Sequence, residues 1–225
     1  MKSTYEKLVD FWNSNFKLTK EYQEELKAAK WQDLAPSEKF LDVLKELKCH
    51  VLDYGAGAGW ASVMLAKMNA DKVTSAEVSI NAIDVIKYYS EAFEVSDKII
   101  PLHIDENWLG NEEENKYDGF FSSNVIDVIP LEMSKEIIRS SALVTKKDAT
   151  TIFSLNYYID NELLDKLGYE HEGPHIFMDG VLRLTSLSDE EWTELFKQYY
   201  KDVKLIYFAW PGEKSEKRRL FILKK

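Results

Sequence analysis

Residues 51–60, which read VLDYGAGAGW, constrain the fold of this chain more than any other stretch. Two apolar residues and an acid lead directly into glycines at positions 55, 57 and 59, and the segment ASVMLAKM that follows has a helical pattern. Glycine adopts positive φ easily and lets a ligand approach the backbone without a side chain in the way. The sequence therefore predicts a buried strand that turns tightly into a helix, with a ligand site at the turn.

From residue 49 onward, strand and helix patterns alternate along the chain. Strands are predicted over 49–54, 72–78, 98–103, 117–122 and 149–155, and helices over 60–68, 80–95 and 131–146. Such alternation is typical of a parallel sheet with right-handed crossovers. Further strand patterns over 203–210 and 218–223 indicate a closing hairpin. We therefore expect an α/β, Rossmann-like, seven-stranded and mostly parallel sheet with an antiparallel C-terminal hairpin.

We expect the 225 residues to form a single domain with four parts. The segment 156–187 interrupts the alternation and is long for a connection, so it is predicted to be an insertion with a functional role. Its aromatic residues argue against disorder. The four parts are an N-terminal helical cap (1–48), a ligand-binding core (49–155), the insertion after the fifth strand (156–187), and a C-terminal helix and hairpin (188–225).

Composition excludes several classes of protein. The net charge of −10 disfavours nucleic-acid binding, which needs a basic surface. No stretch approaches the roughly 20 apolar residues of a membrane span, and Cys49 has no second cysteine with which to form a disulfide. The histidines lack the spacing of metal ligands, so no metal is expected. We expect a cytoplasmic protein that binds neither membranes nor nucleic acid.

Phosphate-binding motifs fit the glycine turn poorly. A nicotinamide site needs G-x-G-x-x-G, whereas this turn has G-x-G-x-G followed by Trp60, whose indole is expected to obstruct a phosphate. A P-loop needs Gly-Lys-Ser or Gly-Lys-Thr, which is absent from the sequence. Asp53 before the turn is a poor neighbour for phosphate but a good acceptor for a cationic amine.

Polar residues follow the next three predicted strands. Glu77 stands at the end of the second, where a carboxylate can accept two ribose hydroxyls. Asp105 and Glu106 follow the third strand and can accept from an adenine amino group, and Asn124 follows the fourth. Because these strand ends meet at one edge of the sheet, the residues are predicted to form one nucleoside site.

Two motifs resemble those of the class I S-adenosylmethionine-dependent methyltransferases. VLDYGAGAGWASVMLA resembles the first motif of that family, D-x-G-x-G-x-G, and YDGFFSSNVIDVIP resembles the fourth. The resemblance covers roughly residues 36–155 and the late hairpin, and extends to bacterial small-molecule methyltransferases of the type 11 and type 25 groups. It implies S-adenosylmethionine as cofactor, S-adenosylhomocysteine as product, and in-line methyl transfer (EC 2.1.1.-) to a small molecule.

The resemblance also assigns residues to the cofactor. Asp53 is expected near the methionine end, Glu77 at the ribose with Val78 beside the adenine, and the residues after the third strand at the adenine edge. Asn124 and Val125 are expected beneath the methionine. The complete expected set is Asp53, Tyr54, Gly55, Ala56, Gly57, Gly59, Glu77, Val78, Asp105, Glu106, Asn124 and Val125.

The methyl acceptor is expected between the N-terminal helices and the insertion. Candidate residues there are Trp12, Phe16, Tyr157, Tyr158, Phe177 and Asp179. Aromatic and acidic groups together suit an amine, or another cationic or aromatic small molecule. Where many relatives have histidine, this chain has Asp127, so the candidates for acid–base work are Asp127 and Tyr157, with His175 as a further helper.

Two other classes of function stay open at this point. One is a catalytically silent module that binds S-adenosylmethionine, and the other is a NAD-dependent Rossmann oxidoreductase. The sequence leaves the acceptor atom undefined and allows either a monomer or a dimer.

Overall fold

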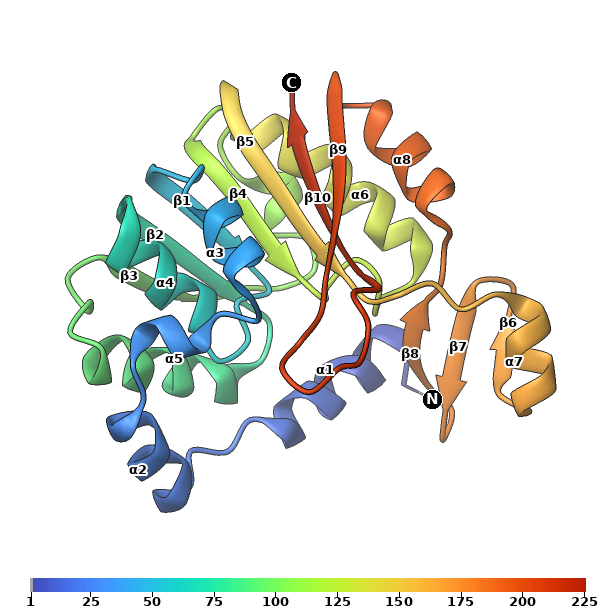
Figure 1. The fold of residues 1–225 in the computed structure, drawn as a ribbon, viewed down its shortest axis with the longest axis horizontal. Coiled ribbons are helices and arrows are strands. Elements are labelled where there is room, and N and C mark those ends of the chain that lie inside the picture. Colours follow the sequence, from blue (N-terminus) through green and yellow to red (C-terminus); the bar gives the residue numbers. More distant parts are fainter. Residues whose placement is uncertain (1) are drawn as a thin grey trace.

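A seven-stranded sheet forms the centre of the protein (Figure 1). The computed structural model describes residues 2–225. The strands follow the order β3-β2-β1-β4-β5-β10-β9, and β10 pairs antiparallel with both β5 and β9. Their bounds are β1 (Cys49–Tyr54), β2 (Ala70–Glu77), β3 (Ile99–His103), β4 (Tyr117–Ser123), β5 (Thr145–Leu155), β9 (Asp202–Phe208) and β10 (Arg218–Lys224). The predicted fold class is confirmed.

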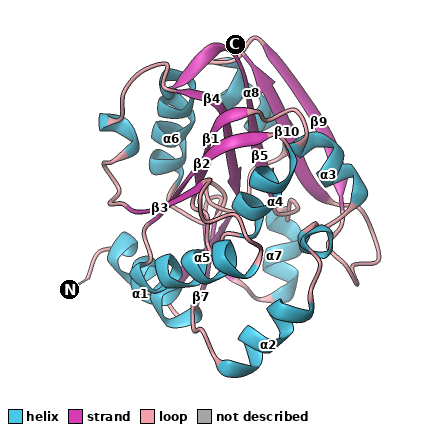
Figure 2. Cartoon of the chain, turned by 90° about the vertical axis from the view of Figure 1, so that its left-hand side faces the viewer, coloured by secondary structure: helices cyan, strands magenta, loops and turns pink. Residues whose placement is uncertain are grey.

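Helices cover both faces of this sheet (Figure 2). One apolar layer joins α3, α4 and α5 to the sheet, and a second joins α6 and α8 to the opposite face. Since both faces are covered, the central strands are almost continuously buried over their carboxyl-terminal halves. The bounds are α1 (Thr4–Asn15), α2 (Lys20–Ala28), α3 (Glu38–Leu44), α4 (Trp60–Met68), α5 (Ile80–Ala92), α6 (Leu131–Val144) and α8 (Asp189–Lys197), with 3-10 turns at Trp31–Leu34 and Leu109–Asn111. None of the helices described within residues 2–225 has the length and hydrophobicity needed to cross a membrane.

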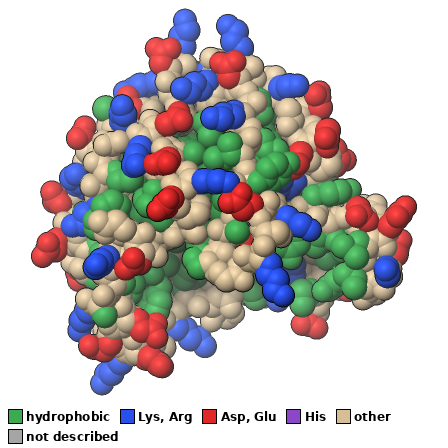
Figure 3. Space-filling model, viewed as in Figure 1, with side chains coloured by type: hydrophobic (Ala, Val, Ile, Leu, Met, Phe, Trp, Pro, Cys, Tyr) green, Lys and Arg blue, Asp and Glu red, His purple; other side chains and the backbone are tan. Residues whose placement is uncertain are grey.

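The insertion contains regular structure that the sequence pattern did not predict. A short helix, α7 (Asn161–Leu167), precedes an antiparallel three-stranded sheet of β6 (Glu170–Glu172), β7 (His175–Met178) and β8 (Val181–Thr185). Asp179 and Gly180 both have positive φ in the tight turn between β7 and β8, as Asp-Gly hairpins require. Several exposed apolar side chains lie on this part of the chain, which forms the green area at the right of Figure 3: Leu163, Leu167, Tyr169 and Met178.

Helix α1 lies across the carboxyl ends of the strands (Figure 1). Ser3 begins it with a capping box, in which the Ser3 side chain accepts from the Glu6 amide and the Glu6 carboxylate accepts from the Ser3 amide. Near its other end, Asn13 accepts hydrogen bonds from the Ser79 hydroxyl and the Asn81 amide, both at 2.8 Å. The helix therefore closes the sheet edge at which the predicted site residues meet.

Candidate active site

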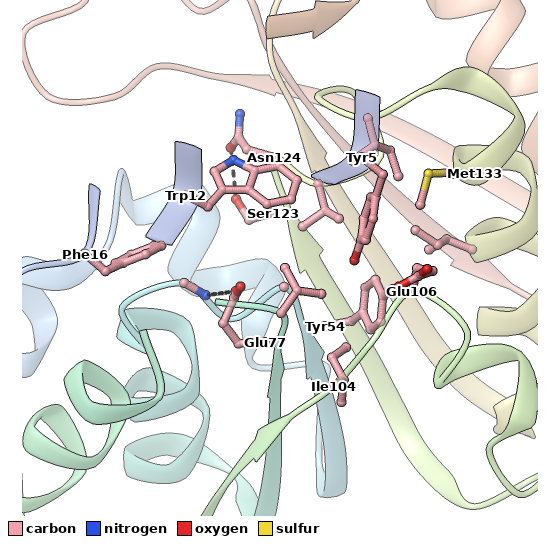
Figure 4. A pocket seen from close by; sticks show the side chains of 16 residues that line it. Tyr5, Trp12, Phe16, Tyr54, Glu77, Ile104, Glu106, Ser123, Asn124 and Met133 are labelled. Carbon is pink, nitrogen blue, oxygen red and sulfur yellow. Dashed lines mark hydrogen bonds between the residues drawn. The ribbon is translucent and has the colours of Figure 1, made fainter. Parts of the chain in front are cut away.

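A cavity of about 210 Å³ lies beneath α1 at the carboxyl edge of the sheet (Figure 4). Its walls come from α1, the glycine turn, the ends of β2, β3 and β4, and the start of α6. The lining residues are Tyr5, Trp12, Phe16, Tyr54, Gly55, Gly57, Glu77, Val78, Ile104, Glu106, Ser123, Asn124, Val125, Ile129, Met133 and Ile137. Segments far apart in the sequence thus form one partly open, largely apolar cavity.

The glycine turn is fitted closely to its neighbours. Gly55 has φ +70°, and a Cβ there would lie 2.2 Å from Val125 Cγ2, so no side chain fits. Gly57 has φ +54°, and a Cβ there would point toward the Phe16 ring at 3.6 Å. Gly59 begins α4 and faces Ile86, so it does not line the cavity. Only the first two glycines therefore present bare backbone to a ligand.

Glu77 is the best-held polar group of the cavity. Its Oε2 accepts from the Gly57 amide and its Oε1 from the Ser79 amide, each at 2.8 Å. Burial raises the pKa of this carboxyl, and the two amide hydrogen bonds oppose that effect. A carboxylate has about four acceptor positions. Two are filled by the backbone, so two stay available to hydroxyl groups of a ligand, which fits the ribose of S-adenosylmethionine.

Asp53 does not reach the cavity. Its carboxyl is buried on the α4 side of β1, where the Ser62 hydroxyl donates to it at 2.5 Å. Burial raises the pKa of Asp53 to about 7, and the nearby Glu77 adds to the effect. Tyr54, the next residue, points the other way and lines the cavity. The structure therefore separates the Asp53 side chain from the cavity.

Of the two acids after β3, Glu106 lines the cavity and Asp105 does not. The Asp105 side chain accepts from the Asn107 amide at 3.0 Å, within its own loop. Tyr5 of α1 lies close to these acids. Burial, together with the carboxylates of Glu106, Glu77 and Asp105, raises the Tyr5 pKa, so the hydroxyl stays protonated at neutral pH.

The residues that follow β4 form the floor of the cavity. Asn124 has φ +55°, and its amide donates to the Ser154 carbonyl at 2.8 Å, which holds the loop against β5. Asn124 and Val125 line the cavity, as does Ser123, which the sequence analysis did not select. Ala56, with Gly59, lies in the turn but outside the lining.

The structure places Asp127 outside the cavity lining. This carboxylate is completely buried, and its Oδ2 accepts from the Asn156 backbone amide at 2.6 Å and from the Asn156 side chain at 3.0 Å. Burial raises the pKa of Asp127, while Asn156 and the Arg219 guanidinium oppose the increase. In this position Asp127 joins the loop after β4 to the end of β5.

The predicted acceptor residues divide into two groups. Trp12 and Phe16 line the cavity from α1. Tyr157 and Tyr158 lie instead in a separate depression beside Lys217 and Arg219. The other predicted acceptor residues belong to the three-stranded sheet and do not line the cavity: Phe177 lies in β7 and Asp179 in the turn after it. His175, the predicted acid–base helper, also lies in β7, where its Nε2 accepts from the Leu131 amide at 3.1 Å.

Sequence reasoning missed an apolar wall made by Ile129, in the loop before α6, and by Met133 and Ile137 of α6. Their spacing of four residues was visible, but the same spacing is typical of any buried helix face. The sequence analysis expected the Trp60 indole to obstruct a ligand at the glycine turn. The indole instead packs against Phe40 and Phe121 and does not line the cavity.

No three His, Cys, Asp or Glu side chains within residues 2–225 lie close enough together to hold a metal ion. The donors and acceptors around the cavity are the hydroxyl, amide and carboxylate groups described above.

Solved structures share this fold across nearly the whole chain. Geranyl diphosphate C-methyltransferase from Streptomyces coelicolor, in complex with Mg²⁺, geranyl diphosphate and S-adenosylhomocysteine, has a TM-score of 0.67 at 9% identity, covering 99% of this chain and 97% of that chain. A chain of the complex between the Haloferax volcanii Trm112 methyltransferase activator and a methyltransferase has a TM-score of 0.66 at 14% identity and covers 96% of both chains. The protein has the class I S-adenosylmethionine-dependent methyltransferase fold.

Sequence comparison points in the same direction. Residues 32–124, which include the glycine turn and β4, match the family model of the methyltransferase small domain. A curated bifunctional methyltransferase from Rickettsia conorii is 31% identical over 113 residues, which is 47% of this chain. The chain spans about one fifth of the length of that relative, because the match covers 21% of it.

Proposed function

We propose that residues 1–225 act as one S-adenosylmethionine-dependent methyltransferase domain that methylates a small molecule. The observation that carries the proposal is the Glu77 carboxylate, held by the Gly57 and Ser79 amides at the end of β2. Glu77 has two acceptor positions left for ribose hydroxyls, and it lies between the bare Gly57 backbone and the Val78 side chain. The methyltransferase small domain over residues 32–124 supports the same conclusion.

Each part of the cavity has a role in this reaction. Bound S-adenosylmethionine supplies an activated methyl group on a positively charged sulfur. The carboxylates of Glu77 and Glu106 favour a cationic ligand in the cavity. Trp12 and Phe16 close it from above, and the apolar wall at the start of α6 excludes water. Orientation and exclusion of water are the main contributions that such a reaction needs from the protein.

The cavity lining offers hydroxyls in place of a strong base. Tyr5 and Tyr54 both keep their protons at neutral pH, because burial raises the pKa of each phenol. They therefore serve as hydrogen-bond donors that orient a ligand. Asp127 and Tyr157 stay candidates for acid–base work, but each would have to act from outside the lining. An acceptor that arrives with a free lone pair fits this cavity best.

Calorimetry with S-adenosylhomocysteine and with NAD tests the proposal. We expect S-adenosylhomocysteine to bind and NAD not to. Gly57→Ala should weaken that binding at least tenfold, since the new methyl group enters the cavity. Gly168→Ala is the matched control, because Gly168 also has positive φ but nothing lies within 4 Å of a Cβ there. Binding of NAD alone would favour an oxidoreductase and contradict the proposal.

Turnover separates an enzyme from a silent binding module. We expect transfer of labelled methyl groups from S-adenosylmethionine to members of a panel of small amines, phenols and carboxylic acids. Binding of S-adenosylhomocysteine without transfer to any panel member, and without slow formation of S-adenosylhomocysteine from the cofactor, would favour the silent module. The net charge of −10 and the single cysteine support a cytoplasmic site of action without nucleic-acid partners.

A further inference from the structure

A groove of about 680 Å³ continues from the cofactor cavity toward solvent. It runs between the first turn of α1, the loop after β3 and the outer face of α6. Tyr5, Glu106, Met133 and Ile137 line both spaces, so the groove and the cavity meet at these side chains. Figure 4 shows Tyr5, Glu106 and Met133 together at one end of the cavity, opposite Phe16.

The groove is lined by acids and by no described basic residue. Its glutamates are Glu6, Glu106, Glu132 and Glu136. Two of them form exposed ion pairs outside the lining, Glu132 with Lys135 and Glu136 with Arg139. The other two, Glu6 and Glu106, form no ion pair within residues 2–225, so the groove keeps a net negative charge.

A buried hydroxyl without a partner also lies in the groove. Ser140 is 2% exposed and lines the groove near the Glu136 carboxylate, and its Oγ has no partner of ordinary hydrogen-bond geometry within the described residues. Buried polar groups are nearly always hydrogen-bonded, so an unpaired one in a cavity wall points to a ligand that supplies the partner. Leu109, Met133 and Ile137 give the same groove an apolar surface.

We propose that this groove binds the methyl acceptor, and that the acceptor carries a cationic amino group on an apolar segment, separate from the lone-pair atom that receives the methyl group. The inference rests on the proposed function, because it places the acceptor against a cavity assigned to the cofactor. Carboxylates along the groove attract ammonium groups, the apolar surface packs against methylene groups, and the Ser140 hydroxyl accepts from or donates to a polar group of the ligand. The depression at Tyr157 and Tyr158 suits a cation less well, since Lys217 and Arg219 line it and balance the charge of its two acids, Asp189 and Glu216.

Calorimetry on the full chain saturated with S-adenosylhomocysteine tests the groove. The probes are 1,5-diaminopentane, 1,5-pentanediol and glutarate, which share one chain length and differ in charge. We expect the diamine to bind at least tenfold more tightly than the diol or glutarate. Equal or tighter binding of either of the other two probes would overturn the proposal.

Substitutions in the groove test whether the diamine binds there. E132Q/E136Q is expected to weaken diamine binding by about threefold to tenfold, and Ser140→Ala by a similar factor through loss of one hydrogen bond. Neither should change the affinity for S-adenosylhomocysteine, which also shows that the variants fold. Glu194→Gln is the matched control, because it removes the same type of exposed ion pair, with Lys197, on α8.

The outcomes distinguish the two proposals. If the wild type binds S-adenosylhomocysteine but not the diamine, or if E132Q/E136Q and Ser140→Ala bind the diamine as the wild type does, the groove is not the amine site and the cofactor assignment stands. If the wild type binds no S-adenosylhomocysteine, the proposed function fails and the acceptor assignment fails with it.

Discussion

The buried carboxyl of Asp53 should make the protein less stable as the pH rises. Its folded-state pKa of about 7 lies well above its ordinary value of 3.8, mainly because of burial. Between these two values the folded protein keeps a proton that the unfolded chain releases. The free energy of unfolding must therefore fall as the pH rises from about 4 to about 7, and then level off.

The size of this effect follows from the two pKa values. One unit of difference between the folded and unfolded pKa corresponds to about 1.36 kcal/mol, so the free energy of unfolding should fall by about 4 kcal/mol in total. About 2.5 kcal/mol of it falls between pH 5 and pH 8. Asp53→Asn removes the titration and keeps an oxygen to accept from the Ser62 hydroxyl, so the variant should gain stability relative to the wild type over this range.

Urea denaturation of wild type and Asp53→Asn at pH 5 and pH 8, without cofactor, measures this difference. We expect the stability of the variant relative to wild type to increase by about 2.5 kcal/mol between the two pH values, or about 5–10 °C in Tm. Asp84→Asn, at an exposed ion pair with Lys87, is the control and should show no comparable change. Equal differences at pH 5 and pH 8 for Asp53→Asn would refute the raised pKa.

Three further substitutions test how the site is held. Gly55→Ala forces a methyl group to within 2.2 Å of Val125 Cγ2 at positive φ, and should cost at least about 2 kcal/mol in urea denaturation and abolish S-adenosylhomocysteine binding. Glu77→Gln places an NH₂ group against a backbone amide donor, and calorimetry should show roughly tenfold to hundredfold weaker binding of S-adenosylhomocysteine. Arg219→Met removes a fully buried cation that donates to the Leu187 carbonyl at 2.6 Å, and should lower the free energy of unfolding by about 3 kcal/mol or more. A variant with the wild-type free energy of unfolding, or with the wild-type affinity for S-adenosylhomocysteine, would contradict the corresponding expectation.

The central fold was predictable because its pattern is strong. Most strands of the large sheet contain a short apolar stretch, and alternation with helices allows few topologies. The boundaries were less predictable. The strand β5 begins at Thr145, four residues before the predicted start, because exposed Lys146, Lys147 and Asp148 continue it beyond the buried part of the sheet. The strand β6 reads Glu-His-Glu, which has no apolar pattern to detect.

The site was predictable to the level of strand ends, but not to the level of side-chain direction. Neighbouring residues of a strand point to opposite faces. Asp53 and Tyr54 must therefore diverge, and nothing local in the sequence says which one faces the ligand. Glu77 and Glu106 line the cavity. Tyr157 and Asp179 do not line it, because the path of the insertion depends on contacts distant in sequence.

The insertion is bonded to the loop between β4 and α6. The Thr185 amide donates to the Asp127 carbonyl at 2.7 Å, and the Thr185 hydroxyl donates to the Ile129 carbonyl at 2.6 Å. Grafting residues 156–187 into a relative would therefore require the partner loop to travel with them, since each buried carbonyl left without a donor costs about 1–3 kcal/mol. The two segments therefore form one structural unit, and exchanging either of them between relatives means exchanging both.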